Sequence, residues 1–131
     1  HNQSIYLYYK SFLGEIEGLK LVKFNDKFKT SFKNIVIELE ESWPFTREST
    51  VKLLNSEGIL ARAYYSPALH QKMMLYPHVS CKLPVTEEIV QKYVLMPSGF
   101  MVTENDIKIV INFLKFLSQN SSDISVKLTD I

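Results

Sequence analysis

The segment from residue 58 to residue 99 constrains the fold of this chain more than any other part of the sequence. Gly58 stands where a helix ends in a left-handed residue, and the apolar run from Ile59 to about Tyr65 predicts a buried strand. That strand has to stop before Pro67, because proline has no N–H to donate to a sheet. Pro84 suits the first turn of a following helix. This order gathers polar side chains at one strand end, a common place for small-molecule sites.

Three more helices are predicted outside this segment, two before it and one after it. Apolar residues at helical spacing predict a helix over residues 2–13, and Thr46 is placed as the N-cap of the helix that ends at Gly58. Thr103 and Asp106 form a capping box at the start of the last helix. The apolar stripe of that helix consists of Ile107, Val110, Ile111, Leu114 and Leu117.

Alternating apolar residues predict a pair of strands. Ile35, Ile37 and Leu39 share one face of a strand over residues 34–40. Leu19 to Phe24 predict a shorter strand, and the polar turn that separates the two favours antiparallel pairing.

The order helix, two strands, helix, strand, helix, strand, helix predicts an α+β domain with a small, mostly antiparallel sheet packed with helices. The helix that opens at Pro84 is expected to present Ile89, Val90, Tyr93 and Val94 on its apolar side, before a short strand at Leu95-Met96. We expect residues 1–131 to form a single domain with a polar tail over about 119–131. Whether Ile124 to Leu128 add a strand stays open.

Composition excludes several classes of protein. The formal charge of +1 gives no general attraction to nucleic acid or anionic lipid, and no apolar run approaches the length of a membrane span. A hydrophobic fraction of 46% argues against disorder. The single cysteine, Cys81, cannot form an internal disulfide, which favours a reducing, cytoplasmic location. The absence of a starting methionine suggests that the chain was cut from something longer.

His70 is the first candidate for a ligand contact. It follows Pro67 by three residues, so its imidazole is placed to donate to a phosphate or a sugar hydroxyl. The alternative is a solvated loop histidine.

Tyr64, Tyr65 and Arg62 are the other candidates for substrate binding. The two tyrosines lie on opposite faces of the predicted strand, so at most one points into any given pocket. Arg62 shares a face with Tyr64 and is suited to a bidentate phosphate contact. A surface ion pair of Arg62 with Glu38 or Glu40 is the competing interpretation.

A lysine-rich stretch over residues 20–33 includes Phe24, Phe28 and Phe32 at a spacing of four. We interpret it as a solvated edge with aromatic anchors rather than a nucleic-acid groove. Cys81 has no partner spacing for a metal, and the four glycines form no phosphate-binding loop. No catalytic residue and no metal ligand is therefore assigned.

Four motifs carry a family resemblance. Residues 58–70 read GILARAYYSPALH, residues 83–87 read LPVTE, residues 95–99 read LMPSG and residues 46–48 read TRE. The same motifs, in the same order and over nearly the whole chain, resemble the carboxy-terminal part of the DegT/DnrJ/EryC1/StrS family of pyridoxal-phosphate-dependent sugar aminotransferases. The resemblance implies the small carboxy-terminal domain of an aspartate aminotransferase-like (fold-type-I) enzyme.

The resemblance implies amino transfer, usually from glutamate, to a keto-deoxysugar linked to a nucleoside diphosphate, in deoxysugar or cell-surface polysaccharide biosynthesis. The parent enzyme is expected to be a homodimer whose large domain holds the coenzyme through a Schiff-base lysine. None of the 13 lysines here matches that motif, so we expect the chain alone to be inactive. Tyr65 stands where the family commonly has a phenylalanine, and Ala68 stands where the family often has a larger residue or a glycine, which leaves sugar selectivity open.

Apolar residues are expected to meet the large domain or a second subunit, namely Tyr6, Phe12, Trp43, Phe45 and Phe100. Two rival interpretations remain. A stand-alone ligand-binding or regulatory module predicts a closed pocket, whereas an accessory domain predicts a half-site open on one side. An interaction domain that uses the lysine-rich stretch predicts salt-dependent binding to a polyanion.

Overall fold

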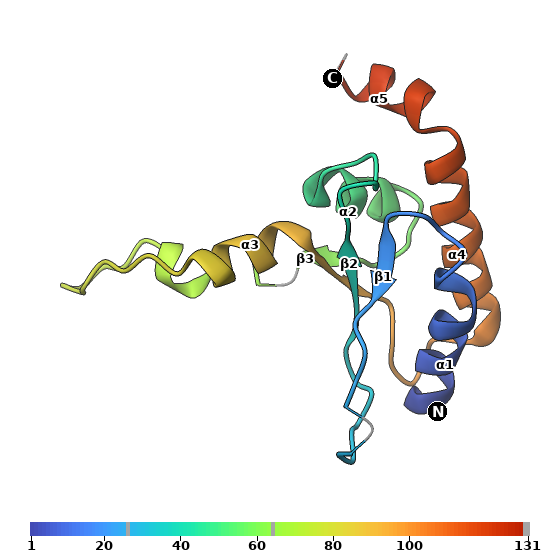
Figure 1. Cartoon of the computed structure of the whole chain (residues 1–131), viewed down its shortest axis with the longest axis horizontal. Helices are drawn as coiled ribbons and strands as arrows, with labels where there is room; N and C mark the ends of the chain where they lie inside the picture. Colours follow the sequence, from blue (N-terminus) through green and yellow to red (C-terminus); the bar gives the residue numbers. More distant parts are fainter. Residues whose placement is uncertain (26, 64, 130–131) are drawn as a thin grey trace.

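The computed structural model describes residues 1–25, 27–63 and 65–129 and is an α+β fold, as predicted (Figure 1). Its sheet has the order β1-β2-β4-β3, and all three pairings are antiparallel. The strands are β1 (Leu19–Leu21), β2 (Ile35–Leu39), β3 (Arg62–Ala63) and β4 (Tyr93–Met96). Ile37 in the middle of β2 pairs with Leu21 on one side and Val94 on the other.

The described residues also form five α-helices and one short 3-10 helix. They are α1 (Asn2–Leu13), α2 (Arg47–Ser56), η1 (Leu69–Gln71), α3 (Pro84–Lys92), α4 (Glu104–Gln119) and α5 (Ser121–Thr129). In Figure 1, α1 and α4 lie side by side against the sheet, while α3 points away from it.

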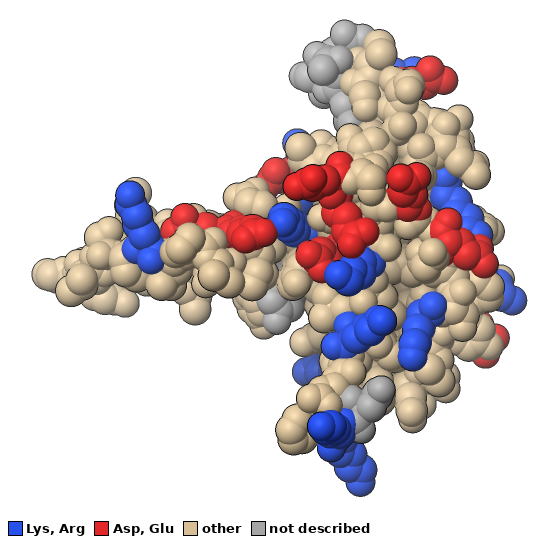
Figure 2. Space-filling view, viewed as in Figure 1, with Lys and Arg blue, Asp and Glu red and all other residues tan. Residues whose placement is uncertain are grey.

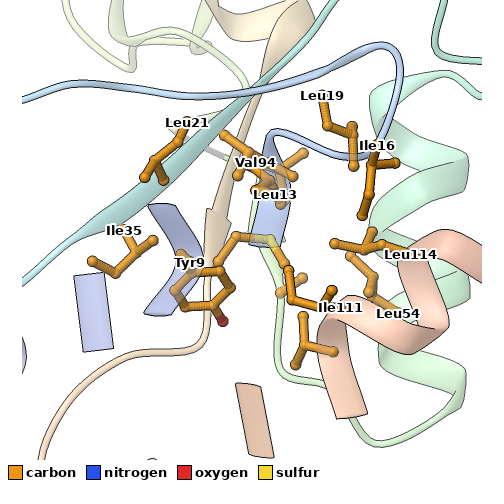
Figure 3. Close-up of a cluster of buried hydrophobic side chains, with 14 of the residues drawn as sticks. Tyr9, Leu13, Ile16, Leu19, Leu21, Ile35, Leu54, Val94, Ile111 and Leu114 are labelled. Atoms are coloured by element: carbon orange, nitrogen blue, oxygen red, sulfur yellow. The ribbon is translucent and has the colours of Figure 1, made fainter. Parts of the chain in front are cut away.

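One hydrophobic core joins the sheet to α1, α2 and α4 (Figure 3). Ile35 and Ile37 of β2 are fully buried, because the alternation of this strand turns every second side chain inward. The five apolar residues of the stripe predicted for α4 are all buried. Tyr9 of α1 lies among them and donates a hydrogen bond from its hydroxyl to the carbonyl oxygen of Pro97, at 3.0 Å. Burial raises the pKa of this phenol well above its ordinary value.

Side-chain caps fix the helix starts where the sequence predicts them. The Thr46 hydroxyl accepts a hydrogen bond from the Ser49 amide, and Thr103 forms a reciprocal capping box with Asp106. The Asp106 carboxylate accepts both the hydroxyl and the amide of Thr103, which lowers the pKa of Asp106. Gly58 follows α2 with a φ of 73°, as predicted for a left-handed helix end.

Gly18 marks a close approach of two backbone segments. Its φ is 80°, and a Cβ atom at this position would lie 2.4 Å from the backbone nitrogen of Trp43. Glycine is therefore required here both by conformation and by space.

Three of the four strands, β1, β2 and β3, are shorter than predicted. β1 ends at Leu21 rather than near Phe24, and β3 covers only Arg62 and Ala63 of the described residues. Tyr64 lies outside the described residues. The chain beyond Leu21 leaves the sheet as an irregular hairpin, in which Phe24 and Phe32 pack on Tyr6 at ring distances of 5.0 and 5.1 Å.

In the carboxy-terminal half, one prediction is corrected and one open question is answered. Tyr93 and Val94 belong to β4 rather than to the apolar side of α3, because Val94 pairs with Ile37 in the middle of the sheet. Residues 121–129 form the helix α5, which contains Ile124, so the stretch whose structure the sequence left open is helical. Hydrophobic alternation is too short there to separate the two periodicities.

Three of the five residues expected on a docking surface belong to the core instead. Tyr6, Trp43 and Phe45 are buried, and the Trp43 indole N–H donates to the Thr50 hydroxyl at 2.9 Å. Phe12 is partly buried against the same core, and Phe100 is exposed. No helix in the described ranges is long and apolar enough to cross a membrane.

Candidate functional site

A cleft of about 330 Å³ lies where β3 runs into the loop before η1. Its walls include Asn34, Arg62, Tyr65, Ser66, Leu69 and Lys72. β3 supplies Arg62, the loop after it supplies Tyr65 and Ser66, and Lys72 follows η1 directly. The cleft is open to solvent, since Tyr65 and Leu69 are both about 70% exposed. The polar residues therefore gather at one strand end, as the sequence analysis expected.

Two cations give this cleft its chemical character. Arg62 and Lys72 line it, and none of the described residues in its wall carries a carboxylate. The surface ion pairs proposed for Arg62 are absent from the described part of the chain, where Lys20 lies 3.9 Å from both Glu38 and Glu40 instead. A guanidinium and an ammonium group in the wall of one cleft, with no carboxylate among its described residues, favour an anionic ligand such as a phosphate.

Tyr65 presents a phenol ring at the mouth of the cleft. Its backbone has a φ of 47°, in the left-handed region that a residue with a side chain rarely adopts. Holding a tyrosine there costs about 1–2 kcal/mol relative to an ordinary conformation. Such conformations concentrate at binding sites, where the rest of the fold enforces them. The ring is placed to stack on a planar or sugar ligand.

His70 does not line the cleft but fastens the loop beside it. Its Nε2 lies 3.0 Å from Oε1 of Glu87, and its side chain is only 9% exposed. The same Glu87 oxygen accepts the backbone N–H of Leu83 at 3.1 Å. The hydrogen bond with His70 is the main reason why the pKa of Glu87 is lowered, followed by the bond from Leu83. His70 and Glu87 thus tie η1 to the first turn of α3.

Arg47 supports the other side of the same loop. It is 4% exposed, and its Nη2 donates to the Ser66 hydroxyl at 3.0 Å and to the Glu48 carboxylate. Its Nε and Nη1 are buried and have no hydrogen-bond partner among the described residues. Burying a guanidinium is costly unless it is paired, so the contact with Ser66 and Glu48 offsets only part of that cost.

The structure thus unites two of the four predicted site residues, Arg62 and Tyr65, in one cleft. His70 lies next to it with its imidazole occupied by Glu87, and Tyr64 falls outside the described residues. Sequence reasoning missed Lys72 and Arg47. The signal for Lys72 was its position two residues after His70, whereas nothing in the sequence predicts that Arg47 is buried.

The other candidate sites have less structural support. Cys81 is an exposed free thiol, and the described residues contain no group of His, Cys, Asp and Glu side chains suited to a metal ion. The lysine-rich stretch forms the hairpin at the lower end of Figure 2, with Phe28 exposed at 72%. Only Phe24 and Phe32 of the three phenylalanines act as anchors on the body.

Comparison with known proteins shows which family matches this sequence and which solved structures share its fold. The model of the DegT/DnrJ/EryC1/StrS aminotransferase family matches residues 1–115. The solved structure of DesI, determined in the presence of its TDP-sugar product, superposes with a TM-score of 0.86 at 20% identity. It covers 98% of this chain, which in turn covers 33% of the DesI chain.

Two further solved structures are similar. The aminotransferase TlmJ from Streptoalloteichus hindustanus has a TM-score of 0.74 at 18% identity, with 95% of this chain and 32% of TlmJ covered. A DegT DnrJ EryC1 StrS aminotransferase from Brucella abortus has a TM-score of 0.70 at 21% identity, with 89% and 30% covered. This chain therefore spans about a third of the length of these relatives. No curated protein matches the sequence.

Proposed function

From the premise that this chain belongs to the DegT/DnrJ/EryC1/StrS aminotransferase family, we propose that it is the carboxy-terminal small domain of a nucleotide-sugar aminotransferase. The parent enzyme moves an amino group, from glutamate, to a keto-deoxysugar carried by a nucleoside diphosphate. It acts in the cytoplasm, in deoxysugar or polysaccharide biosynthesis. A nucleotide-linked sugar is also the ligand named for DesI, which shares this fold.

The observation that carries the proposal is the open cationic cleft. A nucleoside diphosphate brings two phosphates, a sugar and a planar base to its site. Arg62 and Lys72 supply positive charge for the phosphates, and Tyr65 supplies a ring for stacking on the sugar or base. Asn34 adds an amide that both donates and accepts hydrogen bonds.

The role of each side chain is assigned from its chemistry and, for Arg47, His70 and Glu87, from its contacts. Arg62 binds a phosphate through two parallel N–H donors, while Lys72 acts as a point charge. Arg47 and the His70–Glu87 pair hold the loop that carries Tyr65 and Ser66 from opposite sides. His70 is thus a positioning residue rather than the direct ligand that the sequence suggested.

The coenzyme is expected to belong to another part of the parent enzyme. Pyridoxal phosphate, when bound, supplies the electron sink for amino transfer, and proteins hold it through a lysine and a group that faces its pyridine nitrogen. Among the described residues, the cleft offers one exposed lysine and no carboxylate, which does not fit that group. We therefore propose that this chain alone does not transaminate.

The stand-alone module is the weaker alternative. It calls for a pocket closed by this chain's own residues, whereas the walls around Arg62 leave one side open to solvent. A half-site of this kind suits a domain that completes its cleft with residues from elsewhere.

Titration of the chain with thymidine diphosphate tests the proposal. We expect chemical-shift changes at the amides of Arg62, Ala63 and Tyr65 in an NMR spectrum, with weak affinity because the site is incomplete. Arg62→Gln should weaken binding about tenfold, the usual effect of losing a hydrogen bond to a charged group. Lys10→Gln removes the same charge from an exposed position on α1 and should leave binding unchanged.

Shift changes confined to other surfaces, or equal losses in Arg62→Gln and Lys10→Gln, would show that the cleft does not recognise the diphosphate. Addition of pyridoxal phosphate to the same sample should leave no coenzyme absorbance after dialysis. Retained coenzyme would overturn the assignment of this chain as an accessory domain.

A further inference from the structure

A lysine-rich hairpin projects from one end of the sheet. We define the hairpin as residues 22–34, the segment that connects β1 to β2, and Figure 1 shows that it extends well beyond both strands. Its base is fixed, because Phe24 and Phe32 pack on Tyr6 and their own rings meet at 5.0 Å. The hairpin therefore holds its tip at a defined distance from the core.

An exposed phenylalanine occupies the tip of the hairpin. The amide of Phe28 donates to the carbonyl oxygen of Asn25 at 3.1 Å, and the amide of Lys27 donates to the side-chain oxygen of Asn25 at 3.0 Å. This turn leaves the Phe28 ring 72% exposed between Lys27 and Lys29, which are themselves exposed. The ring is therefore free to contact a partner surface.

A second exposed apolar segment lies beside the base of the hairpin. Phe100 and Met101, in the turn before α4, are 87% and 83% exposed. The Ser98 hydroxyl donates to the carbonyl oxygen of Lys33 at 2.7 Å, which joins this turn to the hairpin. Residues 30–33 and Phe100 also line the same hollow. We call the hairpin and residues 98–101 together the hairpin face.

Charge is unevenly distributed along the chain, although the overall charge is only +1. Residues 18–37 contain five lysines and one acidic residue, whereas residues 38–48 contain four glutamates and one arginine. Figure 2 shows basic side chains continuing down the hairpin and acidic ones gathered above it. This asymmetry turns the hairpin toward an anionic surface. The hairpin lysines, none of which pairs with a described carboxylate, are Lys23, Lys27, Lys29 and Lys33.

The exposed apolar side chains distinguish between anionic partners. Single-stranded nucleic acid is bound in grooves where successive bases stack on aromatic rings, whereas Phe28 stands at a convex tip. Lysines combined with exposed apolar side chains are typical of segments that bind the membrane interface. There an aromatic ring enters the boundary of the acyl chains, while the lysine ammonium groups stay among the lipid phosphates. The chemistry of the hairpin face therefore favours a lipid surface.

We propose that the hairpin face binds the surface of an anionic lipid bilayer. Phe28 inserts between the headgroups, and Lys27 and Lys29 pair with lipid phosphates on either side of it. Phe100 and Met101 contact the same surface, so for Phe100 this partner replaces the large domain that the sequence suggested. Binding is reversible and salt-dependent, because few apolar side chains insert and salt screens the lysine contacts. This inference does not depend on the proposed enzymatic function.

Co-sedimentation of the 131-residue chain with lipid vesicles tests the proposal. In low salt we expect the chain to pellet with vesicles made of equal amounts of phosphatidylcholine and phosphatidylglycerol. It should stay in the supernatant with pure phosphatidylcholine vesicles, and raising the salt concentration should release it from the mixed vesicles.

Phe28→Ala should weaken binding to the mixed vesicles about tenfold, because it removes the inserting ring. Leu75→Ala is the matched control for loss of an exposed apolar side chain. Leu75 is 100% exposed but lies on the arm, which we define as residues 69–92 and which points away from the hairpin in Figure 1. This variant should bind vesicles like the parent chain.

The lysines are tested by a double variant. Lys27→Gln with Lys29→Gln should weaken vesicle binding about twentyfold, which corresponds to about fivefold for each lysine at an anionic surface. Lys52→Gln with Lys82→Gln is the charge-matched control. It removes two exposed lysines outside the hairpin face and should leave vesicle binding unchanged.

Failure of the chain to pellet with the mixed vesicles in low salt would overturn the proposal and leave the hairpin face to a protein partner. Equal losses in the Phe28 and Leu75 variants, or in the two double lysine variants, would overturn it as well. Binding to a single-stranded oligonucleotide in place of the vesicles, measured by fluorescence anisotropy, would assign the hairpin to nucleic acid instead.

Discussion

The body and the arm of this protein are stabilised in different ways. The body, formed by the sheet with α1, α2 and α4, contains one continuous core in which Tyr9, Ile37 and Leu54 are fully buried. Within the arm only Val90 is buried, and polar contacts at Glu87 hold its base. The body therefore carries its stability internally, whereas the arm (residues 69–92) and the adjoining cleft leave most of their side chains exposed.

The largest contrast is expected from truncating a leucine in each region. Leu54→Ala removes a side chain with 0% exposure and should lower the free energy of unfolding by about 2–5 kcal/mol. Leu75→Ala removes a fully exposed one and should change it by no more than about 0.5 kcal/mol in the monomer. Urea denaturation of both variants at low protein concentration measures the difference. Similar losses would mean that the arm packs on the body.

Two glycines give the next contrast, within the body. Gly18→Ala should cost about 2–4 kcal/mol, because the new Cβ meets the Trp43 backbone and the positive φ is strained. Gly58→Ala has the same strain but open space around its Cβ, so about 1 kcal/mol is expected. Equal urea midpoints for the two variants would refute the close approach at Gly18.

Polar contacts at the start of a helix give a smaller difference in stability between the body and the arm. Thr103→Ala removes the hydroxyl that caps α4, and the body should lose about 1 kcal/mol of stability. Glu87→Gln weakens the contacts with His70 and Leu83 at the base of the arm. It should speed local hydrogen exchange at Leu83 while the urea midpoint of the whole chain stays unchanged, because no core residue depends on that contact.

The smallest effect is a pH dependence at the base of the arm. The pKa of Glu87 is lowered from its ordinary value of 4.5, so its contacts are complete at neutral pH and are lost as pH falls through that lowered value. The Leu83 amide resonance should therefore shift with a midpoint below 4.5. Glu87→Gln serves as the control and should abolish this shift. A midpoint at or above 4.5 in the parent chain would contradict the contact with His70.

The fold was largely predictable because its long elements carry strong local signals. The helix over 2–13, the alternation of Ile35, Ile37 and Leu39, and the Thr103–Asp106 capping box are each confirmed. The short elements were not predictable from local pattern. Val94 is a strand residue only because Ile37 lies opposite it, and that pairing joins segments far apart in the sequence.

The candidate site was predictable in its location but not in its contacts. The strand end before Pro67 indicated where Arg62 and Tyr65 would lie. The partner of His70 was hidden because Glu87 sits 17 residues away, beyond the tip of the arm. Arg47 escaped notice because a basic residue at a helix start is ordinarily solvated, and only tertiary packing buries it.

Hydrogen exchange across the whole chain tests most directly whether the core stabilises the body without help from the arm. At low concentration we expect strong protection at Ile37 and Leu114 and rapid exchange from Met73 to Val79, where most side chains are exposed. Arm amides as strongly protected as those of the body, or a body that exchanges as fast as the arm, would contradict the account.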